Sequence, residues 1–182
     1  MNTGVVSIRY AKALYEYAKE QNAQAAVYEN MLQLKSALRK LKELPVVLKS
    51  PSLSNAEKSA LICSAVNPSP VFERFVALVV KNERADMLLY IAYAYIEQYR
   101  KENNLVAVKI TTAVPMPESF LCEIEKVMKA DGNVDVELKN ITDETIIGGF
   151  MCEANSVRYD ASVKKQLDEI RKKLVKSNKK IV

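Results

Sequence analysis

Histidine and tryptophan are absent from this chain of 182 residues. Without histidine, the chain cannot form a Ser-His-Asp triad or a histidine metal site. The sequence also has no Walker phosphate loop, no GxSxG motif and no paired metal-binding motif. The three cysteines, Cys63, Cys122 and Cys152, form no CxxC pair, and we interpret them as small buried residues in a reducing compartment. These absences argue against an enzyme, and we expect no catalytic residue, no metal and no cofactor.

Glycine and proline are scarce, with four and six residues, which favours a helix-rich protein with short connections. Hydrophobic residues make up 49% of the chain, enough for a packed core. The sequence contains no run of about 18 apolar residues, so we expect no direct membrane insertion. An amphipathic pattern begins within the first few residues, which predicts that no signal or transit peptide precedes it. We therefore expect a cytoplasmic protein that associates with a membrane only through partners.

Apolar residues recur at helical spacing through the first half of the chain. Thr3 and Asn22 are suited to cap the first two helices. Ser54 and Glu57 form the pattern of a capping box, and Pro70 follows a capping serine at a favoured helix start. We predict six helical segments. The first begins near residue 3, and the other five cover about 23–41, 46–48, 54–66, 70–80 and 85–101.

The apolar period changes from 3.6 to 2 near Asn104, where alternating, β-branched residues begin. Eight of the nine tyrosines fall before this change, so the two parts also differ in composition. After it we predict strands at 105–111, 134–138, 145–151 and 157–159, a helix at 117–129, and a long C-terminal helix from Ala161. We therefore predict a mainly α protein with two domains, a six-helix bundle over residues 1–104 and a small α+β domain over residues 105–182.

Two adjacent glycines, Gly148 and Gly149, are the most informative feature of the second part, since the chain has only four. They follow a short apolar stretch, and they precede a tight break at Asn155-Ser156 and a helix that opens at Asp160. Adjacent glycines permit a positive φ or a close backbone approach. We interpret them as a feature of strand geometry, because the Lys-Ser/Thr of a phosphate loop does not follow them.

Several short motifs occur in an order that is specific over nearly the whole chain. In sequence order they are Arg9-Tyr10-Ala11-Lys12-Ala13-Leu14, Ser50-Pro51-Ser52-Leu53-Ser54, Asn82-Glu83-Arg84, Val136-x-Leu138, Thr142-Asp143, Ile147-Gly148-Gly149-Phe150 and Asp160-Ala161-Ser162-Val163. This ordered set resembles the delta subunit of F-type ATP synthases, called the oligomycin-sensitivity-conferring protein in mitochondria. Family members often have Gly-Asp where this chain has Asn155-Ser156, but asparagine tolerates the same turn conformation.

The resemblance implies a non-catalytic stator subunit of a proton-translocating F-type ATP synthase, present in one copy per complex. It implies that the N-terminal domain binds N-terminal segments of the alpha subunits, and that the C-terminal domain binds the peripheral-stalk b subunits. This link would keep the catalytic head from turning with the rotor during ATP synthesis. Because we find no transit peptide, we expect a bacterial complex, with this subunit on the cytoplasmic face of the inner membrane.

A second apolar stripe on a helix, beyond the one that faces its own core, is the pattern expected of a groove for a partner helix. The first helix has such a stripe beside its Ala11-Leu14-Ala18 line, and the fifth helix is apolar on nearly all sides. We hypothesise that these two helices line the alpha-subunit groove. The predicted groove residues are Tyr10, Ala13, Leu14, Tyr17, Phe75, Leu78 and Val79. The alternative, that these positions only fill the bundle core, stays open.

The C-terminal helix is rich in basic residues, and we expect it to suit an acidic or amphipathic helix of the stalk. The predicted stalk-binding or signature residues are Gly148, Gly149, Phe150, Asp160, Val163, Lys164, Leu167 and Arg171. A solvated basic face is the alternative. A basic helical adaptor for nucleic acid or protein, unrelated to ATP synthase, is a second alternative. We expect no nucleic-acid partner, because the net charge is only +5 and the apolar stripes favour protein partners.

Overall fold

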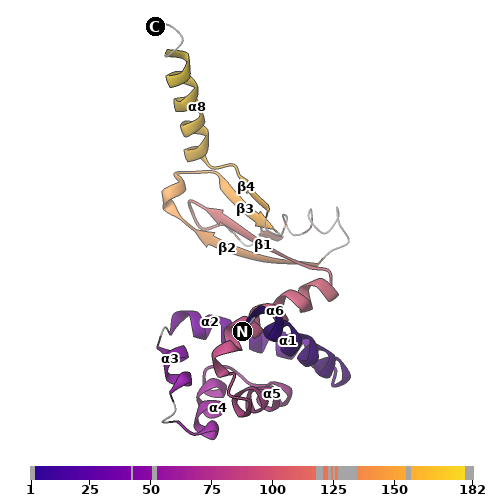
Figure 1. The fold of residues 1–182 in the computed structure, drawn as a ribbon. Helices are drawn as coiled ribbons and strands as arrows, with labels where there is room; N and C mark the ends of the chain where they lie inside the picture. The colour runs from indigo at the N-terminus through magenta and orange to yellow at the C-terminus, as the bar shows by residue number, and fades with distance from the viewer. Residues whose placement is uncertain are drawn as a thin grey trace. The chain divides into compact units, whose positions relative to one another are not determined.

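The computed structural model describes residues 3–41, 43–50, 53–117, 121, 122, 124, 126, 135–154 and 157–178. The chain is mainly helical, with a four-stranded sheet in its C-terminal part (Figure 1). It divides into two compact units, Met1–Glu102 (unit 1) and Asn103–Val182 (unit 2). The division lies two residues before the boundary predicted from the sequence. Among the described residues, no helix combines the length and the apolarity needed to cross a membrane.

Unit 1 consists of helices joined by short connections. Its elements are α1 (Thr3–Glu20), α2 (Gln24–Lys40), α3 (Leu44–Lys49), α4 (Asn55–Ser64), α5 (Pro70–Lys81), the 3-10 turn η1 (Ala85–Met87) and α6 (Leu88–Glu102). Helices α1 and α2 both pack against α6, and α4 packs against α5. Met31, Phe72 and Tyr95 are among the fully buried side chains of this core. The Tyr95 hydroxyl donates to the carbonyl oxygen of Gln24 at 3.2 Å, so its buried oxygen is satisfied, and burial raises the pKa of Tyr95.

Side-chain caps fix two of the helix starts in unit 1. The Ser54 hydroxyl accepts from the Glu57 amide at 3.3 Å, and the Glu57 carboxylate accepts from the Ser54 amide at 2.8 Å. This reciprocal pair confirms the predicted capping box at the start of α4. At the start of α5, the Ser69 hydroxyl accepts from the Phe72 amide at 3.4 Å, with Pro70 as the first helical residue.

Two connections within unit 1 place a non-glycine residue in the left-handed region. The prediction that Asn22 caps α2 is wrong, because Ala23 is the N-cap residue and Asn22 instead takes a φ of 50°. Asparagine tolerates this region better than most residues. Glu83 has a φ of 57° in the predicted break after α5, and the regular turns of α6 begin only at Leu88, after η1.

Unit 2 is built on a four-stranded sheet in the order β2-β1-β3-β4. The strands are β1 (Leu105–Thr112), β2 (Asp135–Thr142), β3 (Phe150–Ala154) and β4 (Val157–Asp160). Strand β1 pairs in parallel with β2 and antiparallel with β3, and β4 pairs antiparallel with β3. The alternating residues of β1 and β2 bury Val108, Ile110 and Val136 on one face, where Met116 and Ile124 pack against them. Strands are therefore present at the predicted positions 105–111, 135–138 and 157–159, while residue 134 lies outside the described residues.

The segment before β3 differs from the predicted strand at 145–151. Residues Glu144–Ile146 form the 3-10 turn η2, and Ile147 follows with a φ of 68°. The carboxylate of Asp143 accepts a hydrogen bond from a backbone amide of this turn at 3.0 Å. This local closure outweighs the strand preference of the β-branched residues, so β3 begins only at Phe150.

The C-terminal helix α8 (Val163–Asn178) begins two residues after the predicted start at Ala161. Ser162 forms its cap, since its hydroxyl accepts from the amide of Lys165 at 3.2 Å. The predicted break at Asn155-Ser156 and most of the predicted helix at 117–129 lie outside the described residues.

Candidate functional site

A groove of about 450 Å³ lies between α1 and α5 in unit 1. It is lined by Arg9, Tyr10, Ala13, Leu14, Tyr17, Arg74, Phe75 and Leu78. Leu14 and Phe75 are 3% and 6% exposed, so they form the floor and belong to the core at the same time. Leu78 is 51% exposed and forms part of the rim. The groove is therefore an apolar hollow on top of a packed interior.

The two tyrosines of the groove are held in place by α5 and the turn that follows it. The Tyr10 ring meets the Phe75 ring edge to face, with centroids 6.4 Å apart. The Tyr10 hydroxyl accepts from Asn82 Nδ2 at 3.0 Å and from Arg84 Nη1 at 3.4 Å. At the other end, the Tyr17 hydroxyl accepts from Arg74 Nη1 at 3.1 Å. These contacts fix the walls of the groove before any partner binds.

Six of the seven predicted groove residues line this one hollow, although α1 and α5 are far apart in the sequence. Val79 does not line it, because its side chain is 0% exposed and faces the core. One residue turns a helix by about 100°, so Val79 points inward where Leu78 points outward. The alternative of a purely core role therefore holds for Val79 and fails for Leu78.

Sequence reasoning did not find Arg9 and Arg74, which line the groove beside the apolar residues. A signal was present, since each arginine stands four residues before a groove residue, Ala13 and Leu78 respectively. Residues four apart share a helix face. The search for apolar stripes alone passed over them.

In unit 2, the paired glycines lie where β3 approaches the start of α8. Gly149 has a φ of 75°, and a Cβ added there would overlap the carbonyl oxygen of Ala161. The carbonyl of Gly148 accepts from the amide of Val163 at 3.0 Å, and the carbonyl of Phe150 accepts from the amide of Ala161 at 3.0 Å. The interpretation as strand geometry is therefore corrected, because the glycines precede the strand and admit the segment that leads into α8.

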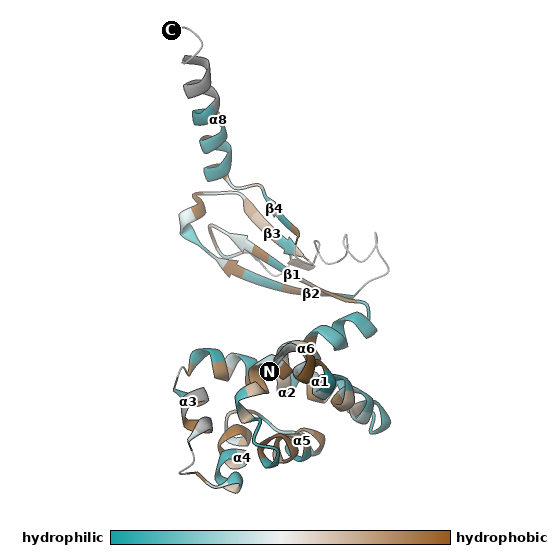
Figure 2. Cartoon of the chain, in the orientation of Figure 1, coloured by the Kyte–Doolittle hydropathy of each residue, from teal (hydrophilic) through white to brown (hydrophobic). Residues whose placement is uncertain are grey.

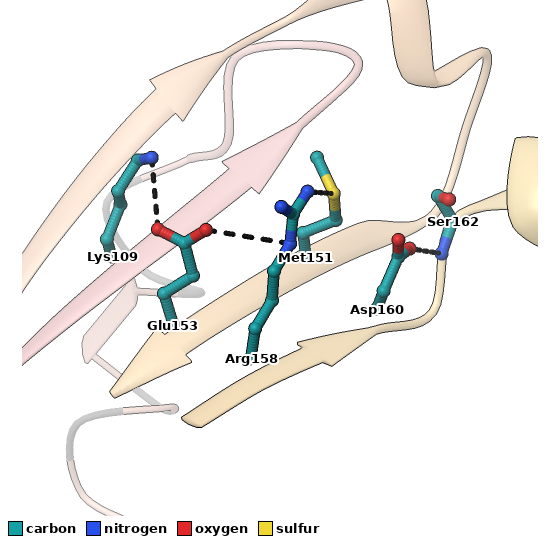
Figure 3. Close-up of polar contacts among 6 residues, drawn as sticks. All are labelled: Lys109, Met151, Glu153, Arg158, Asp160 and Ser162. Atoms are coloured by element: carbon teal, nitrogen blue, oxygen red, sulfur yellow. Dashed lines mark hydrogen bonds and ion pairs between the residues drawn. The ribbon is translucent and has the colours of Figure 1, made fainter. Parts of the chain in front are cut away.

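Asp160 shapes the same junction. Its carboxylate accepts from the amide of Ser162 at 3.0 Å (Figure 3). The hydrogen bonds from Ser162 lower the pKa of Asp160, since they favour the charged carboxylate. In the same way, hydrogen bonds from Thr145 lower the pKa of Asp143. Asp160 thus positions the segment that leads into α8.

Helix α8 carries an apolar stripe that is largely uncovered. Val163, Leu167 and Ile170 lie on one face at helical spacing and are 36%, 53% and 53% exposed. The opposite face is polar: Lys164 and Asp168 line a hollow with Asp143 of unit 2. Figure 2 shows α8 mostly teal, in contrast to the brown residues of α5 and of the strands. The helix therefore turns its polar side toward the sheet end and its apolar stripe outward.

The remaining predicted residues of unit 2 lie in different places. Phe150 is partly exposed and its ring lies 6.3 Å from that of Tyr159, while Arg171 is exposed on α8. Lys164 belongs to the polar hollow, so the structure separates it from Leu167 on the stripe.

A charged ladder crosses one face of the sheet. Lys109 Nζ lies 3.1 Å from one carboxylate oxygen of Glu153, and Arg158 Nε lies 3.5 Å from the other (Figure 3). The Arg158 guanidinium also donates to the Met151 sulfur at 2.9 Å. These side chains are half exposed, and such pairs contribute only about 0–1 kcal/mol each. The ladder gives this face a polar surface, and it pairs Arg158 with Glu153.

The cysteines of the described chain are unpaired, and burial raises the pKa of the Cys63 and Cys152 thiols. Cys63 and Cys152 are therefore neutral, weakly nucleophilic thiols near neutral pH. Cys122 is exposed, so the expectation of a buried residue is wrong for this cysteine. Within the residues that the structure describes, no group of three His, Cys, Asp or Glu side chains could hold a metal ion.

A rigid apolar groove and an exposed apolar helix stripe are surfaces of the kind that hold helices of other proteins. Residues 6–174 match the family model described as ATP synthase delta (OSCP) subunit. The chain is 34% identical to an ATP synthase subunit delta of Bacteroides fragilis over 186 residues and 36% identical to that of Phocaeicola vulgatus over 185 residues, each alignment covering 100% of both chains.

A solved structure shares the fold. The chain resembles one chain of the Toxoplasma gondii mitochondrial ATP synthase hexamer, with a TM-score of 0.65 and 24% sequence identity. The match covers 93% of this chain and 97% of that chain.

These findings define a structural subunit of a larger assembly. The chain belongs to the ATP synthase delta (OSCP) subunit family. As a member of that family, it is a non-catalytic stator subunit of an F-type ATP synthase, as the sequence motifs had indicated.

Proposed function

We propose that the groove of unit 1 binds the N-terminal segment of an alpha subunit, and that the α8 stripe of unit 2 binds the b subunits of the peripheral stalk. One copy of the chain then links head and stalk in each complex. The observation that carries this proposal is the gathering of six predicted residues, from two distant helices, around one apolar groove in a member of this family.

The energetics of the groove suit a long-lived complex. A stator contact must resist rotor torque over many turnovers, so dissociation must be slow, and nanomolar affinity corresponds to about −12 kcal/mol. Ordering a peptide helix costs a further 2–5 kcal/mol or so. Burial of apolar side chains contributes roughly 1.5–3 kcal/mol each, so a few anchors in this groove are sufficient. Exposed ion pairs alone, at about 0–1 kcal/mol each, are not.

We propose that α1 to α6 act as one six-helix bundle, which holds the two groove helices at a fixed separation. The packing of α1 on α6 and of α4 on α5 supports this. So does the contact of Tyr10 with Phe75, which joins α1 directly to α5. A preformed groove lowers the cost of ordering on binding.

In unit 2, the partner helix would cover the stripe of Val163, Leu167 and Ile170. Their spacing of four and three residues is that of a coiled-coil seam. Arg171, which is exposed on the same helix, favours an acidic partner flank.

We place the subunit on the cytoplasmic face of a bacterial inner membrane, attached through the complex. The bacterial relatives that align over the whole chain support this placement.

Co-purification tests the proposed function. The full chain is expressed with the alpha subunit and the soluble part of the b subunit from the same organism, each carrying a different tag. We expect the full chain to retain both partners. In hydrogen exchange, we expect the alpha subunit to protect residues 1–102 of this chain and the b subunit to leave them unprotected. Retention of neither partner, or protection of the same residues by both, would contradict the proposal.

A further inference from the structure

The groove of unit 1 has cationic flanks as well as an apolar floor. Arg9 on α1 and Arg74 on α5 both line it, and both side chains are exposed. A third arginine, Arg84, lies with its guanidinium 5.5 Å from the centre of the Tyr10 ring. No acidic residue is among the residues that line the groove.

The two lining arginines have no carboxylate partner within the described chain. Neither Arg9 nor Arg74 forms an ion pair with a described residue; Arg74 donates to the hydroxyl oxygen of Tyr17. By contrast, Arg158 in unit 2 is paired with Glu153. A guanidinium has five N–H donors in a planar fork that matches a carboxylate. The groove thus presents unmatched positive charge beside apolar surface.

The two arginines stand toward opposite ends of the groove. Arg9 is next to Tyr10, whose hydroxyl meets Asn82 and Arg84 beyond the C-terminal end of α5. Arg74 is in the first half of α5, and its guanidinium meets the hydroxyl of Tyr17. Tyr10 and Tyr17 are seven residues apart on α1, about 10 Å or two helical turns.

We propose that the groove selects a helix whose apolar stripe is flanked by two carboxylates about two turns apart, one for Arg9 and one for Arg74. This inference rests on the proposed function, so the helix is the N-terminal segment of the alpha subunit. The apolar floor supplies most of the affinity, and the arginines fix the register and direction in which the helix lies. A basic segment of equal hydrophobicity is disfavoured, because like charges would meet at both ends.

The test compares the native alpha N-terminal peptide with the same peptide in which every Asp and Glu is replaced by Asn or Gln. Both are titrated into the full-length wild-type chain and into the full-length Arg9→Gln/Arg74→Gln variant at low and physiological salt. Lys12→Gln/Lys19→Gln is the matched control, since it removes the same charge from exposed positions of α1 that do not line the groove.

Neutralising the peptide should weaken binding to the wild-type chain about five- to tenfold, and to the Lys12→Gln/Lys19→Gln control by the same factor. Against Arg9→Gln/Arg74→Gln the two peptides should differ by less than twofold. Equal loss against all three chains, or no loss against the wild type, would overturn the inference, as would an alpha N-terminal segment without two such carboxylates. Failure of the proposed function is distinguishable, because the native peptide would then bind wild type and Leu78→Asn equally weakly.

Discussion

The two candidate docking surfaces are built in opposite ways. In unit 1 the groove has a floor of Leu14 and Phe75, side chains that the chain's own core already buries, and only rim residues such as Leu78 extend outward. In unit 2, α8 turns its polar face to the sheet end and leaves Leu167 and Ile170 more than half exposed.

This difference predicts two kinds of binding. A groove whose walls are fixed by Tyr10 and Tyr17 needs little rearrangement, so its affinity depends on how well a partner fits. An outward stripe contributes apolar area only once a partner covers it, so binding and the stability of α8 should rise together. Substitutions in one surface that leave binding at the other surface unchanged would show that the two surfaces bind independently.

The largest effect is expected from Leu78→Asn in the groove. The change removes an apolar rim contact and places an amide against the partner's apolar stripe. We expect affinity for the alpha N-terminal peptide to fall roughly 100-fold, measured by isothermal titration calorimetry, with b-subunit binding unchanged. Ala77→Asn, at an exposed position of α5 that does not line the groove, is the control and should lose less than twofold. Equal losses for both variants would show that the groove is not the binding surface.

The paired change on α8 is Leu167→Asn/Ile170→Asn. It removes two residues of the outward stripe, and we expect binding of the soluble b-subunit fragment to fall roughly 30-fold or more, with alpha binding unchanged. Gln166→Asn on the same helix lies off the stripe and is the control. Unchanged b binding in the double variant would move the stalk contact away from α8.

Gly149→Ala should destabilise unit 2 and leave the stability of unit 1 unchanged. The Cβ would overlap the Ala161 carbonyl at a φ of 75°, so we expect unit 2 to lose about 2–4 kcal/mol of unfolding free energy while unit 1 is unaffected. Gly4→Ala is the contrast: Gly4 lies in α1 with open space around it, and its substitution should stabilise unit 1 by about 0.5–1 kcal/mol. Urea-dependent hydrogen exchange resolved by segment measures both, and a loss spread over both units would contradict the expectation.

The smallest effect is a dependence of unit 2 on acid pH. The folded-state pKa values of Asp143 and Asp160 are lowered below their unfolded values by hydrogen bonds from Thr145 and Ser162. Their stabilisation is therefore present above the ordinary aspartate pKa, near 3.9, and is lost as the pH falls through the lower folded values. Asp160→Asn should reduce the change of the unfolding free energy of unit 2 with pH between about pH 2 and 5, measured by urea denaturation at a series of pH values. A slope identical to that of the wild type would show that Asp160 makes no such contribution.

Local signals carried most of what could be predicted from the sequence. The capping box at Ser54, the serine-proline start of α5 and the alternation in β1 each depend on neighbouring residues, and each is found where predicted. The groove residues followed from the 3.6-residue period on α1 and α5. That period could not tell Val79 from Leu78, because α5 is apolar on most sides and only the packed core decides which side chain faces inward.

The predictions that were wrong depend on contacts between segments distant in the sequence, or on a side chain that accepts a backbone hydrogen bond in place of a strand partner. Gly149 has its role because the segment at Ala161 crosses it, which no local pattern reveals. The β-branched run before it favoured a strand, yet the Asp143 carboxylate closes a turn there. On α8 the periodicity defined the stripe, but its outward direction depends on the polar contacts of the opposite face.

The most direct measurement is ordered binding to the two surfaces of one chain. The full-length protein is saturated with the alpha N-terminal peptide and then titrated with the soluble b-subunit fragment, and the order is reversed in a second experiment. Two docking surfaces in separate units predict that each partner binds with the same affinity whether or not the other is present, giving a complex of all three. Competition between the partners, with one displacing the other, would contradict a link between head and stalk.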